Sequence, residues 1–441
     1  MPAPACCLLA ALFASSAVVE AAAGAEGEVA AGRAPIELDG PEENSVTFTL
    51  VPGAALRVRS AASSLTLTYT PRIFYRVPNA LEVDRPLVLH QVALDHAQSF
   101  SRRLTWATTG NFSIGEIDYT ASNLVFDPGT SAVRSSVTDI VRADATTGIK
   151  LDVTRRLRWS LDVSGEYTTP LGDDDLPDNL PANLAVLAGS VPESAQFSTR
   201  SSLSYAINRT DRLAANGEVT YQWFPDTGRF LLLSPDISWE SQLNRRTNIS
   251  LSAGVAYVVS LETQVGVSSE NAFGGTGGFS LSTVMYKTRQ ATATTKFNAS
   301  VDWFFDPVAG TSQPRAGVDL GTDITIGRDW VIGPNASFYT TLRDPNSTLG
   351  TPQVVPPDGD PVAPVVTTVI NDYSTQLRGE IPFRYNLSKF VALNWGARAS
   401  LRGRSIVQDN FKLGEQYEIW GFFGLSVRYA GGHDTGNWLS L

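Results

Sequence analysis

The sequence has almost no cysteine, no long apolar run and no basic region. Its two cysteines, Cys6 and Cys7, lie near the start of a 441-residue chain. The remainder can therefore form no disulfide, thiolate metal site or cysteine nucleophile. No uncharged apolar stretch reaches the roughly 20 residues that a membrane-spanning helix requires. The formal net charge is −10 without a basic patch, which argues against nucleic acid as a partner.

The N-terminal residues predict an export signal followed by a flexible segment. An apolar core from Cys6 to Val19 precedes small residues at 21–23, which is typical of a signal peptide over residues 1–23, although no Lys or Arg precedes the core. A buried N-terminal helix is the alternative for this stretch. Residues 24–63 predict a flexible periplasmic segment, and residues 46–60 within it alternatively supply two strands.

From residue 64 onward, apolar and polar residues alternate. In residues 143–167, for example, Ile149 and Leu151 alternate with Lys150 and Asp152, and a second alternating run follows a short basic turn. A period of two over this length predicts a β-hairpin with one apolar and one charged face. The unit recurs along the chain and gives about sixteen strands between residues 64 and 430, or about eighteen if residues 46–60 add two.

The connections between the expected strands alternate between short and long. Every second one is a short polar turn, whereas the others are rich in Pro, Asp and Gly, as in residues 171–194 and 343–370. The strands reach the ~9–11 residues that cross a bilayer when tilted, and Tyr167 and Tyr385 lie near strand ends, as interfacial aromatics do. We therefore predict an all-β, transmembrane, antiparallel up-and-down β-barrel over residues 64–430, with short periplasmic turns, long extracellular loops and a tail at 431–441.

This architecture resembles the Gram-negative outer-membrane β-barrel (porin-like) superfamily over about residues 64–430. The resemblance implies a place in the bacterial outer membrane, contact with outer-membrane lipid and lipopolysaccharide, and insertion by the barrel-assembly machinery. The run LTYTPRIFYRVPN and the strand number are also similar, more faintly, to the barrels that export polysaccharide in myxobacteria. That likeness implies periplasmic export partners.

Many positions that alternate with the apolar ones are charged. They are mostly acidic from about residue 150 to 323 and mostly arginine in the last three strands. Unpaired charges in a dry interior would cost several kcal/mol each, and a barrel of about sixteen strands is wide enough to hold water. These charges predict an aqueous channel with an acidic and a basic wall, unless mutual pairing or an inward loop closes it. The candidate channel-lining residues are Lys150, Asp152, Arg158, Asp162, Glu166, Glu218, Glu240, Asp302, Arg378, Arg384, Arg398, Arg402, Arg404 and Arg428.

Three functions remain open from the sequence. The first is a channel that passes polar solutes across the outer membrane. The second is the barrel component of a polysaccharide export system. The third is a closed structural or adhesive barrel.

No residue pattern indicates an enzyme, a cofactor or a metal site. His90 and His96 share one face of a strand but lie about 20 Å apart, so we interpret them as ordinary lumen or rim residues. The acidic stretch at residues 173–178 matches no EF-hand spacing and is expected to be a solvated loop. The glycines at residues 274–278 are expected to mark a strand that faces an inward loop or plug.

Overall fold

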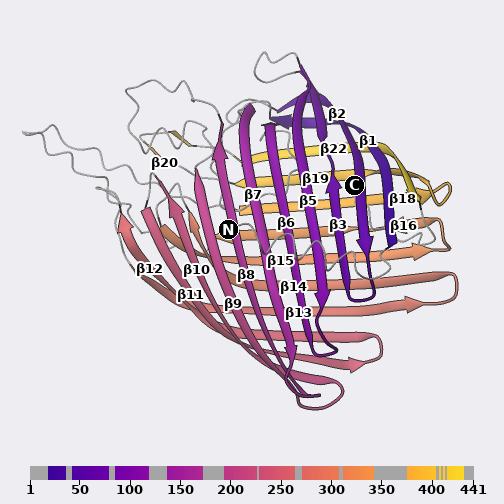
Figure 1. The fold of residues 1–441 in the computed structure, drawn as a ribbon. Coiled ribbons are helices and arrows are strands. Elements are labelled where there is room, and N and C mark those ends of the chain that lie inside the picture. The colour runs from indigo at the N-terminus through magenta and orange to yellow at the C-terminus, as the bar shows by residue number, and fades with distance from the viewer. Residues whose placement is uncertain are drawn as a thin grey trace, which may run out of the picture.

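The structure is a computed structural model that describes residues 18–35, 42–78, 85–118, 137–171, 193–225, 228–263, 271–306, 311–341, 375–403, 407–408, 411–412 and 415–431. The described residues form β-strands joined by turns and bends, and none of them is helical (Figure 1). Among them there is no helix with the length and apolar character to cross a membrane.

The strands vary in length from 2 to 18 residues. In chain order they are β1 (Val18–Pro35), β2 (Glu42–Arg59), β3 (Ser63–Tyr69), β4 (Arg72–Val77), β5 (Leu87–Ser99), β6 (Leu104–Asp118), β7 (Val137–Asp152), β8 (Leu157–Pro170), β9 (Ser194–Ala206), β10 (Asp211–Phe224), β11 (Gly228–Asn244), β12 (Thr247–Thr263), β13 (Ala272–Lys287), β14 (Ala291–Asp306), β15 (Thr311–Ile326), β16 (Trp330–Ile332), β17 (Asn335–Thr341), β18 (Thr375–Asn386), β19 (Val391–Gly403), β20 (Val407–Gln408), β21 (Phe411–Lys412) and β22 (Glu415–Gly431).

One antiparallel sheet closes on itself into an 18-stranded barrel. Two wall strands are interrupted: β3 and β4 both pair with β2, and β16 and β17 both pair with β15. The strands β20 and β21 form a separate two-stranded sheet. Figure 1 shows the indigo N-terminal strands beside the yellow C-terminal ones, where β1 pairs with β22. The predicted antiparallel barrel is confirmed with the alternative count of eighteen strands, and the preferred count of sixteen is wrong.

The two additional strands are β1 and β2, so the alternative that residues 46–60 supply two strands is wrong, because residues 46–59 all lie in β2. Residues 24–63, which the sequence predicted to be flexible, contain most of β1 and all of β2, so that prediction is wrong. The outward positions of β1 are mostly Ala, Gly and Val, whose small side chains make the alternation weak. Its inward positions include Glu20, Glu26 and Glu28.

The two ends of the barrel differ in their connections. The short turns are residues 60–62, 100–103, 153–156, 207–210, 245–246, 288–290, 327–329 and 387–390, and we call this the short-turn end. The first strand begins and the last strand finishes there, because Val18 pairs with Arg59 and Gly431 pairs with Ala21. The other connections include residues 119–136, 171–193 and 342–374, which are much longer, although residues 225–227 form a short one.

Close packing of small and aromatic residues holds the seam between β1 and β22. Ala30 and Ala34 of β1 and Trp420 and Phe422 of β22 form a buried cluster on the inner face. Gly32 lies between the two alanines and pairs with Trp420. A Cβ atom at Gly32 would lie 2.8 Å from the Trp420 ring and 2.9 Å from Trp420 Cα, closer than real Cβ atoms come. The seam therefore requires glycine at position 32.

We expect Gly32→Ala to lower the free energy of unfolding by about 1–3 kcal/mol, because the added methyl group overpacks the seam. Gly217→Ala is the matched control, since a Cβ atom there meets nothing within 4 Å. Urea unfolding of the barrel in lipid vesicles, followed by tryptophan fluorescence, compares the two variants. Equal stabilities would show that the seam adjusts to the methyl group.

The position of β1 constrains where a signal peptide could be cleaved. Residues 18–23 belonged to the predicted signal peptide, but they lie in β1 and pair with residues 54–59 of β2. Cleavage after residue 23 would remove these pairs together with the buried Glu20 and Ala22. We expect the mature protein to begin at or before Val18, which N-terminal sequencing of outer-membrane fractions measures. A mature chain that begins at Gly24 would contradict this prediction.

Candidate channel lining and outer surface

The outer face of the barrel is apolar. Large apolar side chains at alternating positions are exposed all around the sheet, such as Phe48, Ile237, Phe273 and Phe423, with Ile237 60% and Phe273 68% exposed. Because successive side chains of a strand point to opposite faces, the polar residues between them point inward. The barrel thus exposes an apolar surface outward and a polar one inward, the pattern of transmembrane barrels.

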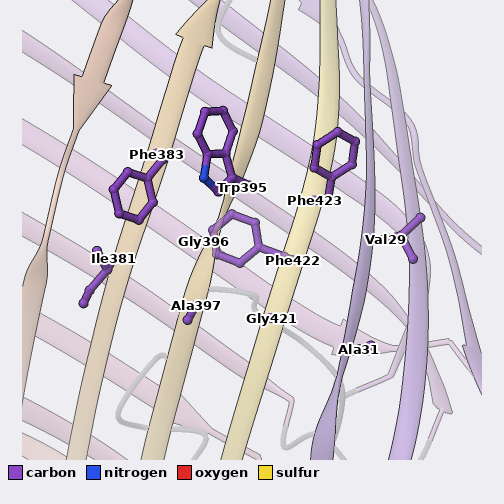
Figure 2. Close-up of a pocket in the computed structure, with 10 residues that line it drawn as sticks. All are labelled: Val29, Ala31, Ile381, Phe383, Trp395, Gly396, Ala397, Gly421, Phe422 and Phe423. Atoms are coloured by element: carbon purple, nitrogen blue, oxygen red, sulfur yellow. The ribbon is translucent and has the colours of Figure 1, made fainter. Parts of the chain in front are cut away.

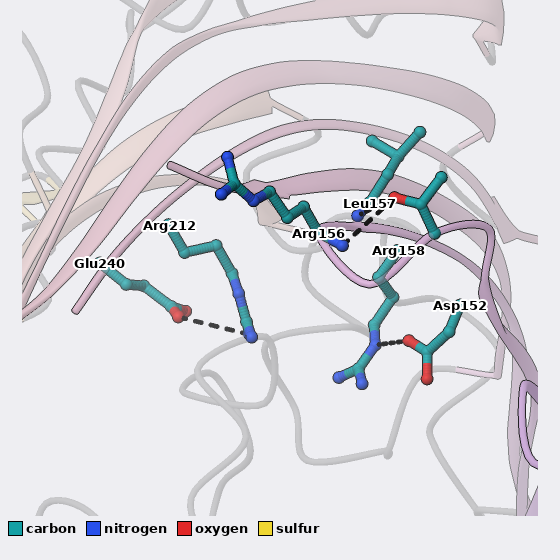
Figure 3. Close-up of polar contacts among 7 residues, drawn as sticks. Asp152, Arg156, Leu157, Arg158, Arg212 and Glu240 are labelled. Atoms are coloured by element: carbon teal, nitrogen blue, oxygen red, sulfur yellow. Dashed lines mark hydrogen bonds and ion pairs between the residues drawn. The ribbon is translucent and has the colours of Figure 1, made fainter. Parts of the chain in front are cut away.

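Inward-facing charges on β7 and β8 form ion pairs with one another. Arg158 Nε donates a 2.7 Å hydrogen bond to Asp152 Oδ1 near the short-turn end (Figure 3). Further along the same two strands, Arg142 Nη2 lies 2.7 Å from Glu166 Oε1. The neighbouring turn is held by Thr154, whose hydroxyl accepts hydrogen bonds from backbone N–H groups within that turn. The Asp152–Arg158 pair and the Thr154 hydroxyl thus hold the lining at the turn of residues 153–156.

The inward-facing pairs of the next strands are open to solvent. Arg212 and Glu240 approach to 4.0 Å between β10 and β11 (Figure 3). Lys296 Nζ lies 3.0 Å from Asp323 Oδ2 between β14 and β15, with the two side chains 59% and 62% exposed. Both pairs are therefore accessible to solvent.

Arginines of β18, β19 and β22 form a second wall, and β1 supplies its counter-charges. Arg398 Nη2 lies 3.1 Å from Glu28 Oε1, with the side chains 10% and 26% exposed. Asn394 Nδ2 donates a 3.0 Å hydrogen bond to Glu26 Oε1. Arg428 also interacts electrostatically with Glu26. The basic wall is therefore partly neutralised by residues of the first strand.

Two donors of this wall have no hydrogen-bond partner. The Nε atoms of Arg398 and Arg428 are buried and bond to no atom of the described residues. A guanidinium presents its donors in a rigid fork that matches carboxylate and phosphate oxygens. Because both Nε atoms are buried, they are not accessible to a solute, and their desolvation is uncompensated among the described residues.

The structure locates most of the predicted channel-lining residues on the inner face. Arg402 lies in β19 but its side chain is outside the described residues, and Arg404 lies outside them altogether. The residues whose strand positions place them inward are Lys150, Asp152, Arg158, Asp162, Glu166, Glu218, Glu240, Asp302, Arg378, Arg384, Arg398 and Arg428.

Few of these residues pair with each other. Among the described ion pairs, only Asp152–Arg158 joins two of them. Asp162 and Glu218 both lie in register with Arg200 of β9, which sequence reasoning did not select. The predicted separation into an acidic and a basic wall is correspondingly reduced, because each wall carries nearby counter-charges.

The two histidines of β5 form contacts with aromatic side chains. His90 accepts or donates a 2.7 Å hydrogen bond with Tyr69, and His96 packs edge-on against Trp106. Both histidines lie on the outer face of β5, so a lumen position is wrong. Within the described residues no three His, Cys, Asp or Glu side chains are grouped to hold a metal ion. The acidic stretch at 173–178 lies outside the described residues.

The glycines at residues 274–278 accommodate an indole ring. A Cβ atom at Gly274 would overlap Trp303 of the neighbouring strand, and Trp303 Nε1 donates a 3.2 Å hydrogen bond to the Gly275 carbonyl. Trp303 lies on the apolar outer face with Val301 and Phe297. The glycines therefore make room for an aromatic residue, and the expected inward loop or plug does not explain them.

A shallow apolar groove of about 590 Å³ crosses the outer face of β1, β22, β19 and β18 (Figure 2). Small residues form its floor, where Ala31, Ala397 and Gly421 lie side by side across three strands. Phe383 and Trp395 border it, and their rings stack 5.9 Å apart. The groove is a depression in the apolar surface and is separate from the lumen.

No protein-family model matches the chain, and no curated protein is significantly similar to it in sequence. Solved structures of outer-membrane proteins are similar to it in fold. The siderophore receptor PirA from Acinetobacter baumannii has a TM-score of 0.50 and 7% identity, covering 94% of this chain and 81% of that one. OccK2 of Pseudomonas aeruginosa has a TM-score of 0.45 and 10% identity, covering 93% and 98%. The FrpB iron transporter from Neisseria meningitidis has a TM-score of 0.43 and 6% identity, covering 92% and 82%.

At these identities the likeness extends to the fold alone. The closed antiparallel sheet, its apolar outer face and the likeness to PirA show an antiparallel β-barrel fold of the transmembrane kind, as the sequence predicted.

The ion pairs Arg398–Glu28 and Lys296–Asp323, 3.1 and 3.0 Å long, should differ in strength because they differ in burial. We expect a double-mutant cycle of Glu28→Gln and Arg398→Met to give a coupling energy of about 1–3 kcal/mol, since each single change leaves a poorly hydrated charge. The same cycle with Asp323→Asn and Lys296→Met should give about 0.2–1 kcal/mol, because both groups are hydrated. Urea unfolding in vesicles measures both cycles, and equal coupling energies would show that burial at the seam is unimportant.

Proposed function

We propose that this chain is an outer-membrane channel that passes polar solutes through a water-filled, charged lumen. The observation that carries the proposal is the solvent exposure of inward-facing ion pairs, above all Lys296 and Asp323. Charges of this kind in a dry interior would be destabilising unless closely paired. Their exposure fits an interior filled with water.

The size of the barrel supports an open lumen. Barrels of about eight strands are filled by their own side chains, whereas those with 16–18 strands leave an aqueous channel. This barrel has 18 strands. The apolar outer face fits a lipid environment, and insertion by the barrel-assembly machinery would follow from that placement.

The lining charges supply a means of selection among solutes. Arg384, Arg398 and Arg428 concentrate positive charge on one side of the lumen. Asp302, Asp319 and Asp323 on β14 and β15 concentrate negative charge elsewhere on the wall. Fixed charges in a low-dielectric wall attract ions of opposite sign and repel those of the same sign. The channel would therefore discriminate by charge as well as by size.

Planar-bilayer recording of the purified, folded protein tests the channel. We expect discrete conductance steps on insertion. Heat-modifiable migration in gels shows whether the protein is folded. A folded protein that inserts into vesicles but carries no current would overturn the proposal and favour a closed structural or adhesive barrel. In cells, loss of surface polysaccharide after deletion, with unchanged uptake of small solutes, would favour polysaccharide export instead.

Selectivity provides a finer measurement. We expect Arg384→Ser with Arg428→Ser to shift the reversal potential in a KCl gradient toward cations, because two positive charges leave the wall. The matched pair Asp302→Asn with Asp323→Asn should shift it toward anions. Unchanged reversal potentials in both variants would show that these residues do not line the conducting path.

A further inference from the structure

The short-turn end carries a ring of exposed basic residues. Seven of its eight turns contain Lys or Arg, and three contain adjacent arginines, Arg102–Arg103, Arg155–Arg156 and Arg245–Arg246. The others contribute Arg209, Arg289, Arg328 and Lys389. All of these side chains are exposed, and Asp329 is the single acidic residue within the eight turns, all of which are described. We call these ten Lys and Arg residues the basic ring.

The connections at the other end of the barrel are mainly acidic in sequence. The connections there contain seventeen Asp or Glu residues and five Lys or Arg residues. General enrichment of the surface in arginine therefore does not explain the basic ring. Its positive charge lies at one end and is distributed over seven of the eight turns, with a gap at residues 60–62 and the β1–β22 seam.

Aromatic side chains lie directly beside the basic ring on the outer face. Phe100 stacks with Trp106, Trp330 packs 4.8 Å from Tyr385, and Phe390 packs 6.2 Å from Tyr429. Aromatic girdles of this kind mark the boundary between hydrocarbon and headgroups. The Lys389 ammonium lies 5.7 Å from the Phe390 ring centre, so basic and aromatic groups meet at this boundary. The ring thus lies at the level of lipid headgroups.

We propose that the basic ring binds anionic phospholipid, of the phosphatidylglycerol type, in the leaflet that meets the short-turn end. Guanidinium groups bind phosphate oxygens in a bidentate manner and are more weakly hydrated than ammonium groups. A ligand that contacts seven of the eight turns must extend around most of the barrel, and a lipid leaflet does so, whereas a protein partner would contact one side. The inference rests on the membrane placement in the proposed function but requires no open lumen.

The outer groove extends the site toward the hydrocarbon. It is bordered by Phe383 and Trp395, on the two strands that the turn containing Lys389 connects. The neighbouring turn with Arg328 leads into Trp330, which packs 5.6 Å from Trp395. A phospholipid whose phosphate is bound by these turns would place an acyl chain along this apolar face.

Native mass spectrometry of the folded full chain, in micelles that contain equal amounts of phosphatidylglycerol and phosphatidylcholine, tests the proposal. We expect phosphatidylglycerol adducts in about tenfold excess, because each basic group near a headgroup layer favours anionic lipid. The variant with Arg102, Arg103, Arg155, Arg156, Arg245 and Arg246 replaced by Ser should lose most of this excess. The variant with Lys at the same six positions should retain most of the phosphatidylglycerol excess. Salt at 0.5 M should reduce this excess in both the native chain and the Lys variant.

Three results would overturn the proposal: no lipid preference in the native chain, a preference retained by the Ser variant, or, in a parallel measurement with lipid A added to the micelles, an arginine-dependent preference for lipid A over phosphatidylglycerol. Folding is checked by heat-modifiable migration. If the six-site Ser variant does not fold, two variants with Ser at positions 102–103 or at positions 245–246 replace it. Each should lose part of the phosphatidylglycerol excess, and an unchanged excess in both would overturn the proposal. Conductance is recorded in parallel, so that failure of the channel and failure of lipid binding remain distinguishable.

Discussion

The pairing of β1 with β22 is the contact on which the rest of this structure depends. In hydrocarbon, each unpaired backbone N–H or C=O costs several kcal/mol, so a sheet can cross a membrane only when it has no open edge. The seam between residues 21–33 and 419–431 removes the last edges of the sheet. Once the sheet is closed, each strand position faces either the outside or the lumen. The alternation of the sequence then corresponds to these two faces.

The sequence predicted the strands whose outward residues are large. In β7 and β8, Ile149, Leu151, Trp159 and Leu161 make the period of two obvious, and the structure confirms these strands and their faces. It did not predict β1, because Ala and Gly at the outward positions carry little hydrophobic contrast with the polar positions. The strand count of sixteen in place of eighteen follows directly from that loss of contrast.

The inward face could be predicted, but the ion pairs on it could not. The parity of a residue within its strand is local information, which a single sequence contains. Partners depend on which strands meet and in what register, and Arg398 and Glu28 are 370 positions apart in the chain. The local pair Asp152–Arg158 lies on two strands joined by a short turn, so the hairpin pattern of the sequence can predict a contact of this kind.

The composition of β1 has a consequence for assembly. The strand pairs with β22 only after the end of the chain has been made, so until then it forms an exposed edge. Such edges template aggregation when they are rich in β-branched and aromatic residues, and charge or low β-propensity suppresses this. With its Ala and Gly residues and its glutamates at positions 20, 26 and 28, β1 is a poor template for foreign strands. The same weak alternation that conceals this strand in the sequence protects the unfinished barrel from premature association.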